Sequence, residues 1–341
     1  MRFKPLAALL LVTAGAPARA ADVSFERDVL PVLTRAGCNA GACHGNLTGK
    51  GGLKLSLKGE DPAGDHAVLT RDMLARRTDP LRPAESLLLQ KATARVPHEG
   101  GARFAADSRE YTAVRDWIAA GCRLDAPGGP TLTKLAVTPA SKVLVDPVDR
   151  FQVKAVAHFS DGTTRDVTPL AAWEFTQVGV AKITPGGEVV REQPGEVVLL
   201  VRYLSLVEPI RLVFLPDRPV PDLAGFAAHN EIDKLVLARL RELRIAPAEL
   251  APDHVFLRRA HLDAHGALPT PDETRAFLAD PDPKKRAKLV DTLLARPEFA
   301  EFWAQKWSDL LRNEEKALDK KGVAVFFRWI AAQISADRPL N

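Results

Sequence analysis

The sequence predicts a multidomain protein in which two helical regions flank an all-β region along the chain. Apolar residues recur at helical spacing up to residue 126, alternate with a period of two over 131–216, and return to helical spacing from 217 onward. The stretch APGGP at 126–130 is typical of a linker between the first two regions. The length of 341 residues suits two or three domains, and a hydrophobic content of 46% is ordinary for folded protein.

The first twenty residues have the three parts of an export signal. Arg2 and Lys4 give a positive start, 6–12 is a short apolar run, and Ala-Arg-Ala at 18–20 is a cleavage pattern. We predict cleavage before Ala21 and export to the periplasm or cell surface, with a retained N-terminal anchor as the alternative. No later stretch is apolar enough to predict an integral membrane segment. Removal of the signal lowers the formal net charge from +4 to +1, so charge gives no support for a nucleic-acid partner.

Residues 21–126 are predicted to form one small all-α domain. The last helix is expected to begin at Ser108, a residue type that caps helix N-termini, and to stop near Gly121. The stretch 49–64 is rich in glycine and is expected to be irregular. The helical segments expected from apolar spacing are 25–37, 66–77, 83–93 and 108–120.

Residues 131–216 are predicted to form an antiparallel β-sandwich of about seven short strands, with a hairpin turn at Asp161-Gly162. Residues 217–341 are predicted to be helical again. Asn230 is a candidate cap for a helix over 230–243, and two later helices are expected to be separated near Pro297.

The stretch RAGCNAGACHGNLTGKGG, residues 35–52, contains the most distinctive chemistry. It holds Cys38 and Cys43, and His44 follows the second cysteine directly. Covalent haem needs two thiols for its vinyl groups and an imidazole for its iron, but the usual spacing is C-x-x-C-H, whereas four residues separate these cysteines. Two nearby cysteines in an exported protein would usually form a disulfide. The local motif therefore leaves haem and a disulfide open. Cys122, the third cysteine, is expected to be a buried thiol or an intermolecular bridge without a redox role.

The surroundings of this motif resemble the cytochrome-c-like domain of large secreted planctomycete proteins. In that family the cysteine pair, C-H-G and G-K-G-G-x-x-L-S-L-x-G recur together, as in CNAGACHGNLTGKGGLKLSLKG here, and VPHEGGARF before SREYTAVRDWIAAG also matches. AVAHFSDGTTRDVT and VAKITPGGEVV resemble group-two bacterial immunoglobulin-like domains. FLRRAHLDAHGALPTPDETRAFLAD resembles the uncharacterised helical domain that follows them.

The resemblance covers nearly the whole mature chain and implies three domains. They are an all-α cytochrome-c-like domain at 21–126, an all-β immunoglobulin-like sandwich at 131–216, and an all-α helical domain at 217–341. Family members continue beyond the point where this chain ends, so we expect the third domain to be truncated. The resemblance also implies haem c, held covalently by Cys38 and Cys43 with His44 as the proximal iron ligand.

The distal iron ligand has three candidates: His66, Met73 and His98. Met73 falls in an expected helix, where ordinary packing is the commoner fate of methionine. His98 lies in a loop just before the last helix of the domain, and the resemblance places a histidine before a glycine pair there. We predict His98 as the distal ligand, with Met73 as the alternative and an open coordination position as the third possibility.

His261 and His265 are four residues apart, so a helix would place both on one face, as in metal-binding helices. No further carboxylate or histidine is obviously positioned beside them, and the family pattern lacks them. We therefore interpret them as substitutions on a helix surface.

These observations predict an exported c-type haem protein that transfers electrons to a redox partner the sequence does not reveal. The immunoglobulin-like domain would be a spacer or binding arm. The alternative is a secreted protein that binds a cell-surface polymer such as a polysaccharide, with a Cys38–Cys43 disulfide. A third hypothesis is a hydrolase or oxidase with its catalytic part in the missing C-terminus, since no catalytic residue can be assigned here.

Overall fold

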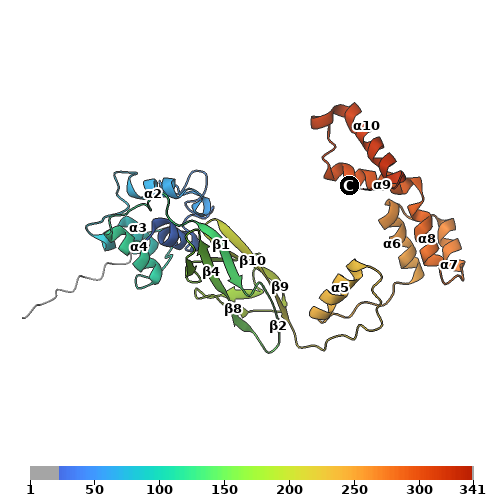
Figure 1. Ribbon diagram of the computed structural model, residues 1–341, viewed down its shortest axis with the longest axis horizontal. Helices are drawn as coiled ribbons and strands as arrows, with labels where there is room; N and C mark the ends of the chain where they lie inside the picture. Colours follow the sequence, from blue (N-terminus) through green and yellow to red (C-terminus); the bar gives the residue numbers. More distant parts are fainter. Residues whose placement is uncertain (1–22, 340–341) are drawn as a thin grey trace, which may run out of the picture. The chain divides into compact units, whose positions relative to one another are not determined.

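The computed structural model describes residues 23–339, so the predicted export signal and its cleavage site lie outside the described residues. A β region at 132–215 lies between helical regions along the chain, which confirms a multidomain protein with both kinds of structure (Figure 1). The chain divides into two compact units, Met1–Ala246 and Pro247–Asn341, and each is described by itself.

The first helical region is built from short helices joined by irregular loops. As predicted, the Ser108 hydroxyl caps the last helix, accepting a hydrogen bond from the Tyr111 amide at 3.1 Å. The helix expected over 66–77 is too long: it ends at Thr70, because the residues around Met73 adopt left-handed backbone angles. The helical elements are η1 (Phe25–Val29), α1 (Leu30–Arg35), η2 (Leu57–Gly59), α2 (Pro62–Thr70), η3 (Pro83–Glu85), α3 (Leu87–Ala92) and α4 (Arg109–Ala119).

The core of this region forms where η1, α1 and α4 meet. Phe25 and Trp117 are fully buried, and their ring centroids are 5.1 Å apart. His66 of α2 also belongs to this core: its Nε2 donates to the Cys122 carbonyl at 2.7 Å, and its ring packs edge-on against Phe25. Cys122 is itself buried.

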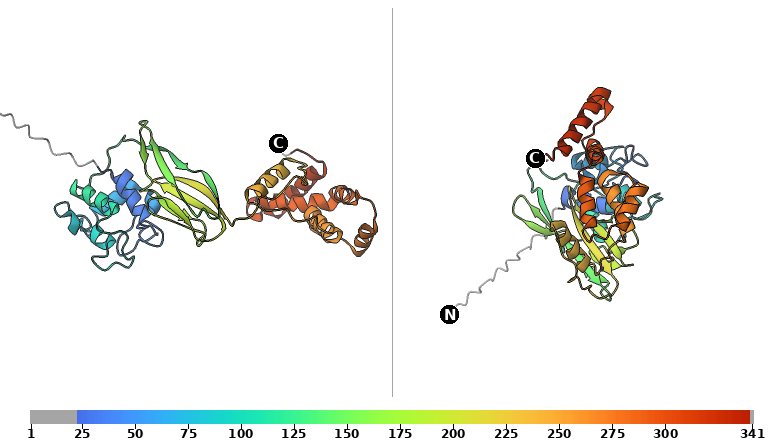
Figure 2. Two further views of the ribbon diagram at one scale, coloured as in Figure 1. Left: turned by 90° about the horizontal axis from the view of Figure 1, so that it is seen from below. Right: turned by 90° about the vertical axis from the view of Figure 1, so that its right-hand side faces the viewer.

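The β region contains ten short strands, more than the seven expected. As predicted, β4 and β5 form an antiparallel hairpin around Asp161-Gly162. The pairing is not antiparallel throughout, since β2 pairs in parallel with β10. The strand orders are β1-β4-β5, β2-β10-β9-β6 and β3-β8-β7, and the strands run alongside one another in Figure 2. The strands are β1 (Leu132–Thr138), β2 (Ser141–Val145), β3 (Arg150–Gln152), β4 (Lys154–Phe159), β5 (Thr164–Asp166), β6 (Ala172–Phe175), β7 (Ala181–Ile183), β8 (Glu188–Arg191), β9 (Gly195–Tyr203) and β10 (Leu206–Leu215).

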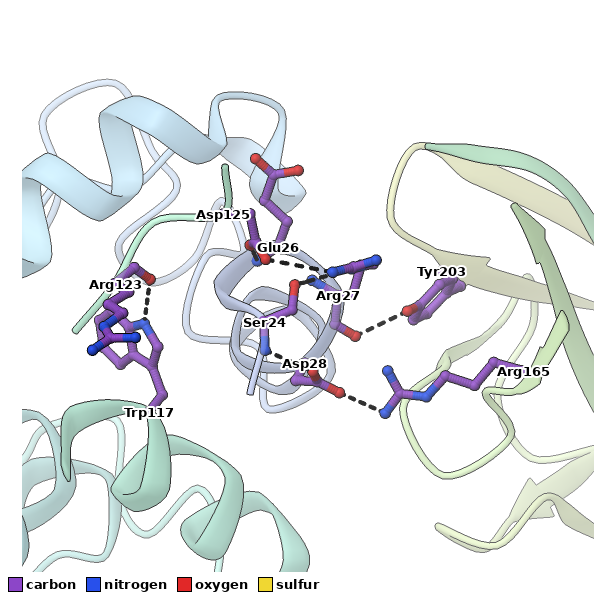
Figure 3. Close-up of polar contacts among 9 residues, drawn as sticks. All are labelled: Ser24, Glu26, Arg27, Asp28, Trp117, Arg123, Asp125, Arg165 and Tyr203. Carbon is purple, nitrogen blue, oxygen red and sulfur yellow. Dashed lines mark hydrogen bonds and ion pairs between the residues drawn. The ribbon is translucent and has the colours of Figure 1, made fainter. Parts of the chain in front are cut away.

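The turn η1 contacts the β region through two polar interactions (Figure 3). The Tyr203 hydroxyl at the end of β9 donates to the Arg27 carbonyl at 2.9 Å, and Arg165 of β5 forms an ion pair with Asp28 at 2.5 Å. On its other side, the Glu26 amide donates to Asp125, just beyond α4, at 2.8 Å. This turn therefore helps to join the first helical region to the strands, together with an ion pair between Lys58 of η2 and Glu174 of β6 at 3.6 Å.

The remaining helices agree with the predicted caps and break. Asn230 caps its helix by accepting from the Asp233 amide at 2.9 Å, and α8 and α9 are separated near Pro297 as expected. Within residues 23–339, no helix combines the length and apolar character needed to cross a membrane. The helices are α5 (Glu231–Glu242) in the first unit and, in the second, α6 (Asp253–His265), α7 (Pro271–Ala279), α8 (Lys285–Leu294), α9 (Pro297–Leu310) and α10 (Glu315–Ser335).

Candidate functional site

The segment from Cys38 to Gly45 folds into a compact loop closed by its own backbone. The His44 amide donates to the Cys38 carbonyl at 3.0 Å, and the Cys43 amide donates to the Ala40 carbonyl at 2.9 Å. A side chain at position 45 would lie 2.0 Å from the Asn39 carbonyl, so only glycine fits after the histidine. The long spacer is therefore an ordered turn. Cys38 and Cys43 are both half-buried free thiols.

The glycine-rich stretch after this loop holds the His44 ring. Nδ1 of His44 is 3.1 Å from the Lys50 carbonyl and 3.1 Å from the Leu53 carbonyl. Since a carbonyl only accepts, Nδ1 carries the proton and Nε2 is the ring nitrogen with a free lone pair. The buried Arg77 fixes the stretch in turn, donating to the Gly52 carbonyl at 2.6 Å.

His98 is held in the same way by its own loop. Its Nδ1 donates to the Gly101 carbonyl at 2.8 Å, which again leaves Nε2 with the free lone pair. A side chain at position 100 would lie 2.9 Å from Cε1 of the His98 ring, so the first glycine of the pair gives the ring room. The sequence VPHEGGARF therefore presents one oriented imidazole.

Arg103 joins the two loops. Its Nε donates to the Ala36 carbonyl at 2.7 Å, just before Cys38, and its Nη1 donates to the Gly100 carbonyl at 3.0 Å. One guanidinium thus ties the His98 loop to the segment that leads into Cys38. Sequence reasoning missed this residue, although it is the penultimate residue of the motif VPHEGGARF that carries His98.

The structure brings the rings of His44 and His98 near one another and nearly parallel, although the two residues are far apart in the chain. Their ring centroids are 6.3 Å apart and their planes differ by 10°. Two imidazoles on opposite sides of one iron are separated by two metal–nitrogen bonds of about 2 Å and two ring radii of about 1 Å, so their centres lie about 6 Å apart. The spacing and the two free Nε2 atoms therefore fit a haem iron, and the two thiols lie on the same loop as His44.

Burial shifts two ionisable groups of this site. Desolvation raises the pKa of the Cys38 thiol to about 11, against a smaller opposing effect of the Arg103 charge. Desolvation also lowers the pKa of His44, partly offset by its hydrogen bonds to the Leu53 and Lys50 carbonyls. At neutral pH the first cysteine is therefore a thiol and His44 is uncharged, which is the form that binds a metal.

Of the other two candidates for the distal ligand, one is exposed and one is buried in the core. Met73 does not lie in a helix as expected but in a turn, and its side chain is 57% exposed. His66 is committed to the core by its hydrogen bond to Cys122. His98 is the candidate whose ring lies parallel to that of His44, with the centroids 6.3 Å apart. Cys122 is a free, buried thiol, which agrees with the first of the two expectations for it.

The second unit contains His261 and His265 on one face of α6, as the spacing predicted. The interpretation as substitutions on a helix surface is wrong for His261, which has no exposed surface. Among residues 23–339, no group of three or more histidine, cysteine, aspartate or glutamate side chains is arranged to hold a metal ion.

Residues 231–341 match a family model described as PSCyt2, a protein of unknown function (DUF1549). This match confirms the resemblance of the third region to the uncharacterised helical domain of the planctomycete proteins. It begins at α5 and does not extend to the first two regions, whose resemblances stay predictions. A comparison with curated proteins finds no match to the chain.

Proposed function

We propose that the first helical region binds haem c and that the protein transfers electrons outside the cytoplasm. Cys38 and Cys43 would form the two thioether bonds, and His44 and His98 would bind the iron from opposite sides. The observation that carries the proposal is the parallel pair of imidazoles, with centroids 6.3 Å apart and each Nδ1 held by a backbone carbonyl.

The contacts with backbone carbonyls fix the tautomer and the orientation in which the two histidines would bind the iron. A ligating imidazole that donates its other N–H to a carbonyl has a fixed tautomer and orientation and is a stronger base toward the metal. Here Lys50 and Leu53 supply these carbonyls for His44, and Gly101 supplies one for His98. Both rings are therefore oriented by backbone carbonyls, whose positions do not depend on side-chain rotamers.

Two axial histidines favour electron transfer over reaction with a small substrate. With a histidine bound on each side, the iron would have no open coordination position. Haem c when bound supplies reversible one-electron transfer, at a lower potential with two histidines than with histidine and methionine. Gly41 and Ala42, between the two cysteines, are exposed, so this loop would give a redox partner access to the site.

Export is part of the proposal because covalent haem is attached outside the cytoplasm by dedicated machinery. The predicted signal at 1–20 supports it. The immunoglobulin-like resemblance of the β region supports a role as a spacer or binding arm, and the contacts of η1 with Tyr203 and Arg165 would hold that arm next to the haem region.

The decisive experiment is a pyridine haemochrome spectrum of the mature chain, residues 21–341, exported with the c-haem maturation system and then denatured. A c-type band that stays with the polypeptide is expected. It should be lost in Cys38→Ala/Cys43→Ala, whereas Cys122→Ala, which changes the third thiol, should retain it. If no haem is found and Cys38 and Cys43 are oxidised to each other, the electron-transfer proposal fails and the polymer-binding alternative becomes the better one.

A further inference from the structure

Two arginines of the first helical region, Arg77 and Arg103, carry charges that no carboxylate balances. In the part of the chain that the structure describes, neither guanidinium forms an ion pair, whereas Arg82 pairs with Asp79 at 3.1 Å. Arg77 is nonetheless buried, with 6% of its surface exposed. A guanidinium cannot lose its proton in a protein, and a buried charge without a partner is costly. The two unbalanced charges therefore need an explanation.

Backbone carbonyls hold Arg77 beside the proximal histidine. Its Nη1 donates to the Val68 carbonyl at 2.7 Å, and its Nη2 donates to the Gly52 carbonyl at 2.6 Å. Gly52 directly precedes Leu53, whose carbonyl holds the His44 ring. These carbonyls satisfy N–H groups but carry no net charge, so the charge of the guanidinium stays unbalanced.

Arg103 is arranged in the same way beside the distal histidine. Its Nη1 donates to the Gly100 carbonyl at 3.0 Å, and the next carbonyl along the chain holds the His98 ring. A side chain at Gly37 would lie 2.7 Å from its Nη2, so the guanidinium also lies against the residue that precedes Cys38. Each histidine loop is therefore held by one guanidinium that has no carboxylate partner.

We infer that Arg77 and Arg103 supply the counter-charges for the two propionate groups of haem c, an inference that rests on the proposed function. Haem c, when bound, brings two carboxylates to the site, and the site has two guanidiniums without an acidic partner. The planar fork of a guanidinium matches a carboxylate, and such charge-assisted hydrogen bonds are the strong ones. Neither arginine has all five of its N–H groups occupied by the carbonyls.

The two charges would also affect the reduction potential. Reduction lowers the positive charge of the iron, so nearby cations favour the reduced form and raise the potential. Arg77 and Arg103 would thus offset part of the low potential that two histidine ligands give. Removal of either charge should lower the midpoint potential.

The test uses the mature chain, residues 21–341, exported with the c-haem maturation system and with haem isotopically labelled at its propionate carboxylates. Arg77→Gln keeps an N–H donor but removes the charge. It should favour oxidised over reduced haem by about tenfold, which equals about 59 mV for one electron. The infrared band of the labelled carboxylates should shift as well. Arg77→Lys, which keeps the charge, should restore most of the potential.

The matched control is Arg82→Gln, the same change at an exposed arginine that has a carboxylate partner, and both readouts should stay at the parent values. The absorption spectrum of each variant should remain low-spin, because both histidines still bind the iron. A displaced loop would change the spin state, so this spectrum separates the charge from a merely structural role.

Parent values of the potential and of the infrared band in both Arg77→Gln and Arg103→Gln would overturn the inference. A lower potential with an unchanged infrared band would also overturn it, because the charge would then act on the iron without contacting a propionate. If Arg77→Gln does not fold, Arg103→Gln decides alone, since Arg103 is only half-buried. A parent chain without haem would instead refute the proposed function, so the two failures are distinguishable.

Discussion

The two histidine pairs of this protein are built in opposite ways. His44 and His98 come from separate loops, and each has its Nδ1 on a backbone carbonyl and its ring parallel to the other. His261 and His265 are one turn apart on one helix, inclined by 70°, with no hydrogen-bond partner on any ring nitrogen. In the first pair, backbone contacts orient two rings that are far apart in the sequence. In the second pair, the rings are close in the sequence, but no hydrogen bond orients them.

The difference shows how two imidazoles can be brought together in a fold. A helix brings two side chains to one face at no further cost, so the second pair needs only the i, i+4 spacing. Rings on opposite sides of a planar group must come from different segments, and those segments must be fixed. The glycine-rich stretch and Arg103 do this for the first pair.

The largest effect should be on haem content, which should depend on the first histidine pair and not on the second. His44→Ala should reduce covalently bound haem by roughly tenfold or more, since it removes an iron ligand. His261→Ala, the matched change in the other pair, should leave haem content unchanged. Haem per polypeptide, from absorbance of purified mature chain, measures both. Equal haem content in the two variants would mean that His44 is not a ligand.

The next effect concerns the chemistry of the first pair. His98→Met should raise the midpoint potential on the order of 0.1 V, within the span of about 0.8 V that axial ligands cover. Redox titration of the exported chain gives the value. The same change at the exposed His229 is the control. An unchanged potential in His98→Met would assign the distal position to another group.

A smaller effect should test how the His98 ring is seated. A methyl group in Gly100→Ala would lie 2.9 Å from Cε1 of the ring and should displace it, giving partly high-spin iron. Gly101→Ala is the opposite case: its φ of 67° makes the variant strained by about 1 kcal/mol, but no atom lies within 4 Å of the new methyl.

The absorption spectra of these two glycine variants should therefore differ in spin state. If Gly101→Ala alone perturbs the spectrum, backbone strain and not ring contact controls the site.

The smallest effect is the pH dependence of the free energy of unfolding. Burial holds the pKa of His261 below its unfolded value, so the unfolded state binds more protons as the pH falls. The free energy of unfolding should therefore decrease as the pH is lowered past about 6.5. This residue should contribute at most about 1.4 kcal/mol per pH unit to the decrease. Urea titrations of the parent and His261→Leu would show it as a flatter profile in the variant. Parallel profiles would contradict burial of His261.

Much of the fold could be predicted from local sequence. The Ser108 and Asn230 caps, the Asp161-Gly162 turn and the break near Pro297 each depend on a few neighbouring residues. The parallel pairing of β2 with β10 could not be predicted, because it joins segments about 70 residues apart, and no local pattern encodes it. The end of α2 before Met73 was also missed, since a good helical pattern continues there.

The candidate site divides in the same way. Cys38, Cys43 and His44 follow from a contiguous motif, and His98 from a resemblance. The Nδ1 contacts with Lys50, Leu53 and Gly101 could not be predicted, because they use backbone carbonyls that have no sequence signature. The burial of His261 was missed because helical spacing shows that residues share a face but not what covers that face.

The central claim is that His44 and His98 bind one haem iron from opposite sides with nearly parallel ring planes. Electron paramagnetic resonance of the oxidised, exported mature chain tests this most directly. The account predicts a low-spin rhombic signal, typical of two parallel imidazoles, that is lost in His98→Ala. A high-spin signal in the parent, or a low-spin signal accompanied by the sulfur-to-iron absorption band of methionine ligation, would contradict it.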